Sequence, residues 1–575
     1  MNKLKPLPEE WSGLLNNEQK EAIENINGPL LIIAGAGSGK TRVLTYRYAH
    51  LIKTYGINFE NVLAITFTNK AANEMKDRIS DLLNLELSPK WISTFHSLCV
   101  KMLRIHGHLI GFNNNFTIYD QSDSTKLVRN CMRDSDIDTK QYSPKRIQAH
   151  ISSLKNQRIL PGEAVEFAQS FFDVKVAEIY SSYQKKLMLA NSMDFDDLLI
   201  KAVELLETSD KSLNYWSSKF QYIMIDEYQD TNMVQYRLVE LLASKHKNIC
   251  VVGDSDQSIY AFRGADIRNI EEFESDFKNA KVISLEKNYR SSQKILDIAN
   301  AVISNNPRKK DKKLWTDNDE GLDVNLVEFN SERDESRWIA EQINKLLEDK
   351  AFTEIAIFYR TNNQSRLFEE ELRKLSLSYK VVGNVRFYDR KEIKDILAYL
   401  NYLINPEDTV SFERILNVPK RGIGESTLQK LRDYANKNEI SLSKSIENLD
   451  EINNLSDRVK KQINNFKEII NDLKSFALQG PSETISKTLE LTGYKDELVK
   501  EGTLDSQMRL ENLDELLTSA FEFENLYEED IEDPFTVLRD YLESIALFTD
   551  SDDVDKEDRI LLMTLHNAKG LEFPV

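Results

Sequence analysis

The chain of 575 residues is 41% hydrophobic and 29% charged, which is typical of a globular protein with about three to five domains. No stretch approaches about 18 consecutive apolar residues and the N-terminus lacks an apolar signal core, so the sequence predicts neither a membrane span nor export. The net charge of −19 argues against a uniformly basic nucleic-acid-binding surface, although a basic groove can lie on an acidic body.

The cysteines and the acidic residues are both unevenly placed. Cys99, Cys131 and Cys250 have no metal-binding spacing, which predicts buried thiols in a reducing cytoplasm. Between Phe521 and Asp555 there are 13 acidic residues and one basic residue, a pattern more typical of a solvated face or linker than of a site.

A glycine-rich segment predicts a phosphate-binding loop. The apolar run that ends at Ala34 predicts a buried strand, and a helical pattern begins at Thr41. Backbone N–H groups at such a helix N-terminus bind polyphosphate. We expect Lys40 to reach the β- and γ-phosphates of ATP and the Thr41 hydroxyl to hold Mg²⁺. The predicted loop comprises Ala34, Gly35, Ala36, Gly37, Ser38, Gly39, Lys40 and Thr41.

Two later strands also end in polar or aromatic residues. The strand at 62–66 leads to Phe67 at the carboxyl edge of the sheet, where open α/β sheets bind ligands. The alternative for Phe67 is a core position. A third segment, 91–97, repeats the pattern of a strand followed by a polar turn.

The strand that ends at Ile225 delivers two adjacent carboxylates. Asp226 is expected to hold Mg²⁺ through water, and Glu227 to polarise the attacking water. The strand at 248–252 then leads to Gln257, which is placed to sense the γ-phosphate. Tyr260 and Phe262 follow as candidates for stacking on nucleic-acid bases, with burial in the core as the alternative.

The remaining pattern predicts a second sheet and two helical regions. Strands are expected at 281–285, 324–328, 354–360 and from 559 onward, and helices at 111–190 and 389–552. The basic cluster 307–313 is interpreted either as a phosphate contact or as a solvated loop. The segment 417–424, which contains Gly-Ile-Gly, is interpreted either as a hairpin on a nucleic-acid backbone or as a tight turn. The fold class is α/β with parallel sheets flanked by helices.

Eight motifs in order make the chain resemble the superfamily 1A DNA helicases of the UvrD/Rep group. The resemblance extends over essentially the whole chain. The motifs are Ala34–Thr41, Thr66–Ala72, Asp226–Asn232, Asp256–Tyr260, Asn288–Ser291, Tyr388–Asp395, Asn417–Gly424 and Thr564–Phe573.

This resemblance implies two RecA-like P-loop NTPase domains with ATP between them, each with a helical insertion. It implies an inchworm-like, ATP-driven 3′-to-5′ translocase on single-stranded DNA that separates strands at junctions with duplex DNA, in repair and replication and with loading or repair proteins as partners. The implied domains are 1–110 and 191–280 (first RecA-like domain), 111–190 (first insertion), 281–388 and 553–575 (second RecA-like domain), and 389–552 (second insertion).

The resemblance also assigns roles to individual residues. Gln19, which by itself could simply begin a polar helix, would read the adenine edge, and Tyr289 would stack on the adenine ring. Arg42 and Arg290 would contact the phosphates, and Glu572 the ribose. The residues implied to bind DNA are Phe67, Asn69, His96, Phe195, Tyr260, Phe262, Arg360 and His566.

The sequence departs from the family pattern in two places. Phe262 stands where relatives usually carry Trp, which predicts a weaker grip on DNA. The chain also ends at Val575, before the family's last motif and its second phosphate-contacting arginine, so we expect little or no turnover from the chain as given.

Two other functions fit the same motifs. One is a DNA-stimulated ATPase that remodels protein–DNA complexes, and the other is the helicase subunit of a helicase–nuclease. A kinase or GTPase is disfavoured, because the chain lacks an Asp two positions after Lys70 for guanine recognition.

Overall fold

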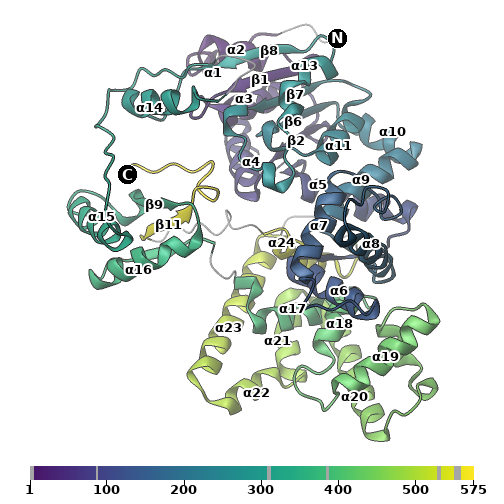
Figure 1. The fold of residues 1–575 in the computed structure, drawn as a ribbon. Helices are drawn as coiled ribbons and strands as arrows, with labels where there is room; N and C mark the ends of the chain where they lie inside the picture. Colours follow the sequence, from purple (N-terminus) through teal and green to yellow (C-terminus); the bar gives the residue numbers. More distant parts are fainter. Residues whose placement is uncertain (1–4, 86–88, 307–311, 384–386, 528–532, 549–557) are drawn as a thin grey trace. The chain divides into compact units, whose positions relative to one another are not determined.

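The computed structural model describes residues 5–85, 89–306, 312–383, 387–527, 533–548 and 558–575. The chain divides into two compact units (Figure 1). Unit 1 comprises Met1–Leu98, Ser209–Asn384 and Thr549–Val575, and unit 2 comprises Cys99–Thr208 and Val385–Phe548. Unit 2 therefore contains the predicted helical region 111–190, within wider limits, and residues 389–548 of the predicted region 389–552. The six domain boundaries stay a prediction.

Unit 1 contains a six-stranded parallel sheet, with helices packed around it (Figure 1). Its inner strands are almost wholly apolar and buried on both faces, which is what a parallel sheet covered by helices requires, whereas the last strand in the order exposes Lys281 and Ser284. In spatial order they are β3 (Ile92–Thr94), β2 (Val62–Thr66), β6 (Tyr222–Ile225), β7 (Ile249–Gly253), β1 (Leu30–Ala34) and β8 (Lys281–Leu285).

The position of β8 corrects one prediction. We expected 281–285 to begin the second sheet, but β8 pairs in parallel with β1, with Leu30 opposite Lys281 and Ala34 opposite Leu285. The prediction was wrong because an apolar strand pattern does not identify the partner strand. As a result, the residues after β8 emerge beside the phosphate loop after β1.

The helices of unit 1 begin at clear capping residues. Asn16 forms a capping box with Gln19 at the start of α2, and the Thr68 side chain caps α4. The main helices are α2 (Asn17–Glu24), α3 (Lys40–Lys53), α4 (Asn69–Leu83), α5 (Phe95–His106, which continues into unit 2), α10 (Asp210–Lys219), α11 (Met233–Ala243) and α14 (Gln293–Ile303). The short helices are α1 (Glu9–Ser12), α12 (Arg268–Glu271) and α13 (Phe273–Asp276).

A second, three-stranded parallel sheet in unit 1 has the order β10 (Tyr379–Val381), β11 (Ile560–Thr564) and β9 (Ala356–Tyr359). Helices α15 (Glu332–Leu346) and α16 (Ser365–Lys374) contribute to its core. The predicted strand at 324–328 is wrong: these described residues form no strand, and Leu326 is 99% exposed. Its alternating pattern resembles a strand, but it has no paired neighbour.

Unit 2 is mainly helical. Strands β4 (Thr117–Tyr119) and β5 (Ser192–Asp194) pair in parallel, a detail the helical pattern did not indicate. Around them lie α6 (Gln121–Asp134), α7 (Pro144–Asn156), α8 (Phe171–Leu189) and α9 (Phe195–Thr208). The buried Asn405 amide donates to Thr117 Oγ1 and to two carbonyls, so buried polar contacts join the two segments of unit 2.

The second segment of unit 2 is organised around α17 (Lys391–Ile404), which contacts α18, α21, α23 and α24. All the helices of this segment share one large hydrophobic core. Besides α17, they are α18 (Thr409–Ile415), α19 (Glu425–Asn438), α20 (Asp457–Phe476), α21 (Pro481–Leu491), α22 (Tyr494–Glu501), α23 (Leu504–Asn525) and α24 (Thr536–Ala546). No helix in the described ranges is long and apolar enough to cross a membrane. The architecture confirms the predicted fold class of parallel sheets flanked by helices.

Candidate functional site

The loop between β1 and α3 has the geometry of a phosphate cradle. Gly37 and Gly39 have φ values of 65° and 88°, which L side chains rarely adopt. A Cβ at Gly37 would lie 2.6 Å from Asn288 Nδ2, and one at Gly39 would lie 2.8 Å from Gln19 Nε2. Glycine is therefore required at both positions. Lys40 and Thr41 form the first turn of α3, where free N–H groups attract anions.

Lys40 is held in this cradle by the two residues expected to act on the γ-phosphate. Its Nζ lies 2.6 Å from Glu227 Oε1 and 3.3 Å from Gln257 Oε1. Burial opposes the charge of Lys40, but the Glu227, Asp226 and Asp254 carboxylates together outweigh it and raise the pKa of Lys40. Burial likewise opposes ionisation of Glu227, but Lys40, Lys569 and the Gln229 amide together outweigh it and lower the pKa of Glu227. The site thus contains an ionised pair.

Asp226 is buried directly beside this ion pair. Burial, followed by the neighbouring Glu227 carboxylate, raises the pKa of Asp226 to about 6. Its Oδ1 accepts a hydrogen bond from the Glu227 N–H at 2.9 Å. A carboxylate whose charge is opposed in this way favours a bound divalent cation. The loop glycines, Lys40 and Asp226 therefore fit a nucleotide polyphosphate with Mg²⁺.

The residues predicted at the adenine end are close to this loop. Gln19 is buried, and its Nε2 donates to Ser38 O at 3.1 Å while its Oε1 accepts from Asn16 N–H at 3.2 Å. The Asn16 Nδ2 in turn donates to the Tyr289 hydroxyl at 3.0 Å. The structure thus brings Gln19 and Tyr289 together beside the loop. Arg42 lies in the first turn of α3, with its guanidinium 5.8 Å from the Tyr46 ring centroid.

The segment after β8 lies directly on the phosphate loop. Asn288 Nδ2 donates to Ala36 O at 2.6 Å, and Tyr289 N–H donates to Gly37 O at 2.9 Å. Arg290 forms an ion pair with Glu572. The two residues predicted to contact the phosphates and the ribose are therefore adjacent, and each neutralises the other.

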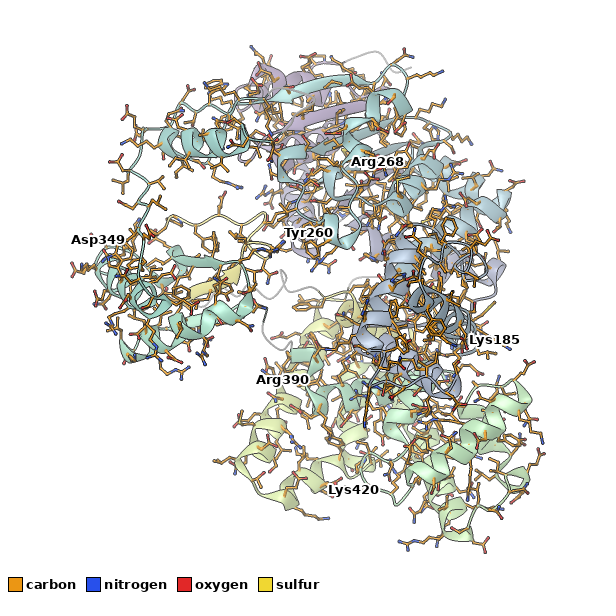
Figure 2. The ribbon with its side chains drawn as sticks, viewed as in Figure 1. Lys185, Tyr260, Arg268, Asp349, Arg390 and Lys420 are labelled. Atoms are coloured by element: carbon orange, nitrogen blue, oxygen red, sulfur yellow. The ribbon has the colours of Figure 1, made fainter. Side chains whose placement is uncertain are left out.

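Aromatic and basic side chains from four segments of unit 1 form a second cluster. Phe67 stacks on Tyr260, which Figure 2 labels, with ring centroids 5.4 Å apart and planes 17° apart. Phe262 is 67% exposed and meets His566 edge-on at 5.2 Å. Arg360 Nη1 lies 3.4 Å from His566 Nδ1. This aromatic cluster brings together five of the eight predicted DNA-binding residues.

The other three predicted DNA-binding residues lie elsewhere. Asn69 is the first residue of α4, two positions after Phe67. His96 lies in the first turn of α5, and burial lowers its pKa to about 4, so its ring is neutral near pH 7. Phe195 begins α9 in unit 2 and is half-buried.

Two basic segments make contacts that their sequence did not indicate. In the segment 417–424, interpreted above as a hairpin on a nucleic-acid backbone or as a tight turn, the Arg421 guanidinium points inward and donates to Ile415 O at 2.8 Å and to the Tyr399 hydroxyl at 2.6 Å. Neighbouring Lys420 is the exposed basic residue of that loop (Figure 2). In the cluster 307–313, residues 307–311 lie outside the described residues, and Lys312 is buried in ion pairs with Asp254 and Asp256. Lys312 is therefore not a solvated phosphate contact.

Sequence reasoning did not single out several residues of the site. The Arg263 guanidinium lies 5.3 Å from the Tyr260 centroid and 5.7 Å from the Phe262 centroid. Lys569 pairs with Asp230 and donates to Gln257 O at 2.8 Å. Gln229 bonds both Glu227 and Asp230. All three occur within or beside the motifs quoted above, and this position was the signal in the sequence that could have identified them.

Replacing Tyr260 with Ala is expected to weaken binding of oligo-dT by roughly 5- to 150-fold, the equivalent of about 1–3 kcal/mol for one stacked base. The measurement is fluorescence anisotropy at low salt. Phe59→Ala, which removes an aromatic ring that is also partly exposed, is the control and should bind as the unmodified chain does. Equal affinity of both variants would contradict stacking at Tyr260.

Comparisons with known proteins agree with this geometry. Residues 15–278 match the family model of the UvrD/REP helicase N-terminal domain, and residues 283–575 match that of the UvrD-like helicase C-terminal domain. The chain is 46% identical over 563 residues to proteins named ATP-dependent DNA helicase PcrA from Staphylococcus aureus strain Mu50 and Staphylococcus epidermidis strain RP62A. Each alignment covers 98% of this chain and 76% of the relative.

Proposed function

The chain belongs to the UvrD/Rep helicase family, and from this premise we propose that it is an ATP-driven motor that moves 3′ to 5′ along single-stranded DNA. It would separate strands at junctions with duplex DNA and act in DNA repair and replication, in the cytoplasm. The observation that carries the proposal is the connection between two clusters. The loop that places Gln257 beside Lys40 also places Tyr260 against Phe67.

At the nucleotide, each residue would act through a contact described above. Lys40 would exchange the Glu227 carboxylate for the β- and γ-phosphates, which frees Glu227 to orient and deprotonate water. Thr41 and Asp226 would hold Mg²⁺. Arg290 would leave Glu572 for the phosphates, and the released Glu572 would be available to the ribose. ATP supplies the phosphoryl bond whose hydrolysis drives the cycle.

At the DNA, the Phe67–Tyr260 stack would open to admit a base between the two rings. Stacking of the base on each ring would replace the contact area that the two rings lose with each other, and such stacking tolerates any base sequence. Arg263 and His566 lie beside the Tyr260 ring and Arg360 lies beside His566, and all three would meet the backbone phosphates. An acidic protein can bind DNA in this way because the contacts are local.

The test measures ATP hydrolysis in single-turnover mode, with protein in excess of ATP, with and without oligo-dT. Strand displacement is then compared on duplexes with a 3′ or a 5′ single-stranded tail. We expect stimulation by DNA and displacement from the 3′-tailed duplex. Displacement from the 5′ tail would overturn the polarity, and stimulation without displacement would favour the remodelling ATPase.

A further inference from the structure

The amide of Gln229 bridges the ends of two neighbouring strands of the first sheet. Gln229 is 0% exposed, and its Nε2 donates to Glu227 Oε2 at 2.5 Å and to Asp230 Oδ2 at 3.2 Å. Its Oε1 accepts the backbone N–H of Asp254 at 2.9 Å. The side chain thus links the carboxylate after β6 directly to the backbone of the loop after β7.

Gly253 shows how closely this bridge is packed. A Cβ at that position would lie 2.5 Å from Gln229 Oε1 and 2.7 Å from Ile270 Cδ1. The backbone of Gly253 is extended as part of β7, so the need for glycine comes from the Gln229 amide rather than from the backbone angle. Position 253 therefore has no room for a side chain next to the Gln229 amide.

The bridge is one side of a closed ring of polar contacts. From Asp254 the ring continues through Gln257, whose Nε2 donates to Asp254 Oδ2 at 2.6 Å. It closes through Lys40, which bonds both Gln257 and Glu227. Of these contacts, those of Lys40 are the ones that a bound phosphate would replace. The Gln229 bridge would then join Glu227 to the loop directly, beside Lys569, which lies 4.0 Å from Glu227 Oε2 and donates to Gln257 O at 2.8 Å.

The same loop ends at the aromatic cluster. Three residues after Gln257, Tyr260 stacks on Phe67, and its hydroxyl donates to His566 O at 3.2 Å. A base that separates the two rings would move Tyr260 and, with it, the short loop back to Asp254. The Asp254 N–H would transmit that movement to the Gln229 amide.

We propose that Gln229 is a positioning residue that couples a base bound at Tyr260 to the orientation of Glu227 for hydrolysis. This inference rests on the proposed function and names the connection within the same site. Because Gln229 is fully buried, it would act by setting the direction in which Glu227 Oε2 points rather than by binding nucleotide or DNA. It therefore accounts for stimulation of hydrolysis by DNA rather than for binding of either ligand.

The first variant is Gln229→Met, which keeps the volume and removes both ends of the bridge. We expect the DNA-stimulated single-turnover rate to fall roughly 10- to 100-fold, as for loss of a hydrogen bond to a charged group. The affinities for nucleotide and oligo-dT should stay within about twofold of the unmodified chain, and the ratio of the DNA-stimulated to the DNA-free rate should fall. A loss of both affinities together with the rate, or an unchanged ratio, would show that Gln229 is merely structural and would overturn the inference.

The second variant, Gly253→Ala, removes no polar group and displaces the amide by its added methyl. We expect the same selective loss of DNA stimulation. Gly13→Ala is the matched control, because a Cβ at Gly13 meets nothing within 4 Å. It should be stimulated like the unmodified chain. Full stimulation in both Gln229→Met and Gly253→Ala would overturn the inference.

Hydrogen–deuterium exchange provides a readout that does not depend on turnover. In the unmodified chain, oligo-dT should protect the segment 254–262 and also the segment 226–230. In Gln229→Met the first protection should remain and the second should be lost. If the unmodified chain shows no stimulation by DNA at all, the proposed function itself fails. If DNA stimulates the unmodified chain but the segment 226–230 is still protected in Gln229→Met, the proposed function stands and only the role of the Gln229 bridge is rejected.

Discussion

Replacing Glu227 with Gln is expected to lower the DNA-stimulated single-turnover rate of ATP hydrolysis by roughly 10²- to 10⁴-fold, the usual contribution of a general base. The amide has nearly the same shape as the carboxylate but cannot accept the proton of the attacking water. Although Glu227 is buried, Lys40 and Lys569 lower its pKa, so the carboxylate is already ionised before Lys40 turns to the phosphates.

Nucleotide binding should respond differently to the same change. Glu227→Gln removes the carboxylate that holds Lys40 at 2.6 Å, so Lys40 is freed for phosphate and nucleotide affinity should be retained or increased. Glu240→Gln, on the outer side of α11, makes the same chemical change away from the site. It should leave both the rate of ATP hydrolysis and the nucleotide affinity unchanged. A Glu227→Gln variant that hydrolyses ATP at the original rate would exclude Glu227 as the base.

The second large effect is expected from Lys155, a lysine with no exposed surface in α7 of unit 2. Its Nζ lies 2.7 Å from Asp194 Oδ2 and 2.8 Å from Asp197 Oδ1. Lys155→Met removes the counter-charge of two buried carboxylates, which costs about 3–5 kcal/mol of stability when one partner of a buried pair is lost. The measurement is denaturant unfolding followed by circular dichroism. Lys175→Met, at an exposed pair on α8, is the control and should cost less than about 1 kcal/mol.

The destabilisation by Lys155→Met should depend on pH. Burial, followed by the Asp194 charge, raises the pKa of Asp197 to about 6. A carboxyl whose folded pKa exceeds its unfolded value of about 3.9 binds its proton more tightly when folded, so its contribution to stability is lost as pH rises from about 4 to about 6. Without Lys155 that pKa rises further. The variant should therefore be more strongly destabilised at about pH 8 than at about pH 5.

A charge-matched variant separates electrostatics from packing. Asp197→Asn in the Lys155→Met background removes one of the two uncompensated charges and should restore part of the lost stability and reduce the pH dependence. No recovery would show that the cost comes from the lost lysine side-chain packing. Because Asp194 and Asp197 flank Phe195, the same ion pairs hold the turn that begins α9 and carries that predicted DNA-binding residue.

The sequence by itself determined the parts of the site that depend on neighbours along the chain. The buried strand, the glycines at 37 and 39 and the helix beginning at Lys40 form one local unit, since their backbone angles and helix N-terminus are set within about ten residues. The adjacent carboxylates Asp226 and Glu227 after β6 follow for the same reason. Their roles with nucleotide and DNA stay predictions.

Only the tertiary structure decided what depends on partners far along the chain. It assigned β8 to the first sheet, left 324–328 unpaired and turned Arg421 toward backbone carbonyls, because strand pairing and side-chain direction depend on contacts that local pattern does not specify. It also formed the bridge from Glu227 through Gln229 to Asp254. That bridge joins residues about 25 positions apart, since parallel strands bring distant strand ends to one edge of the sheet.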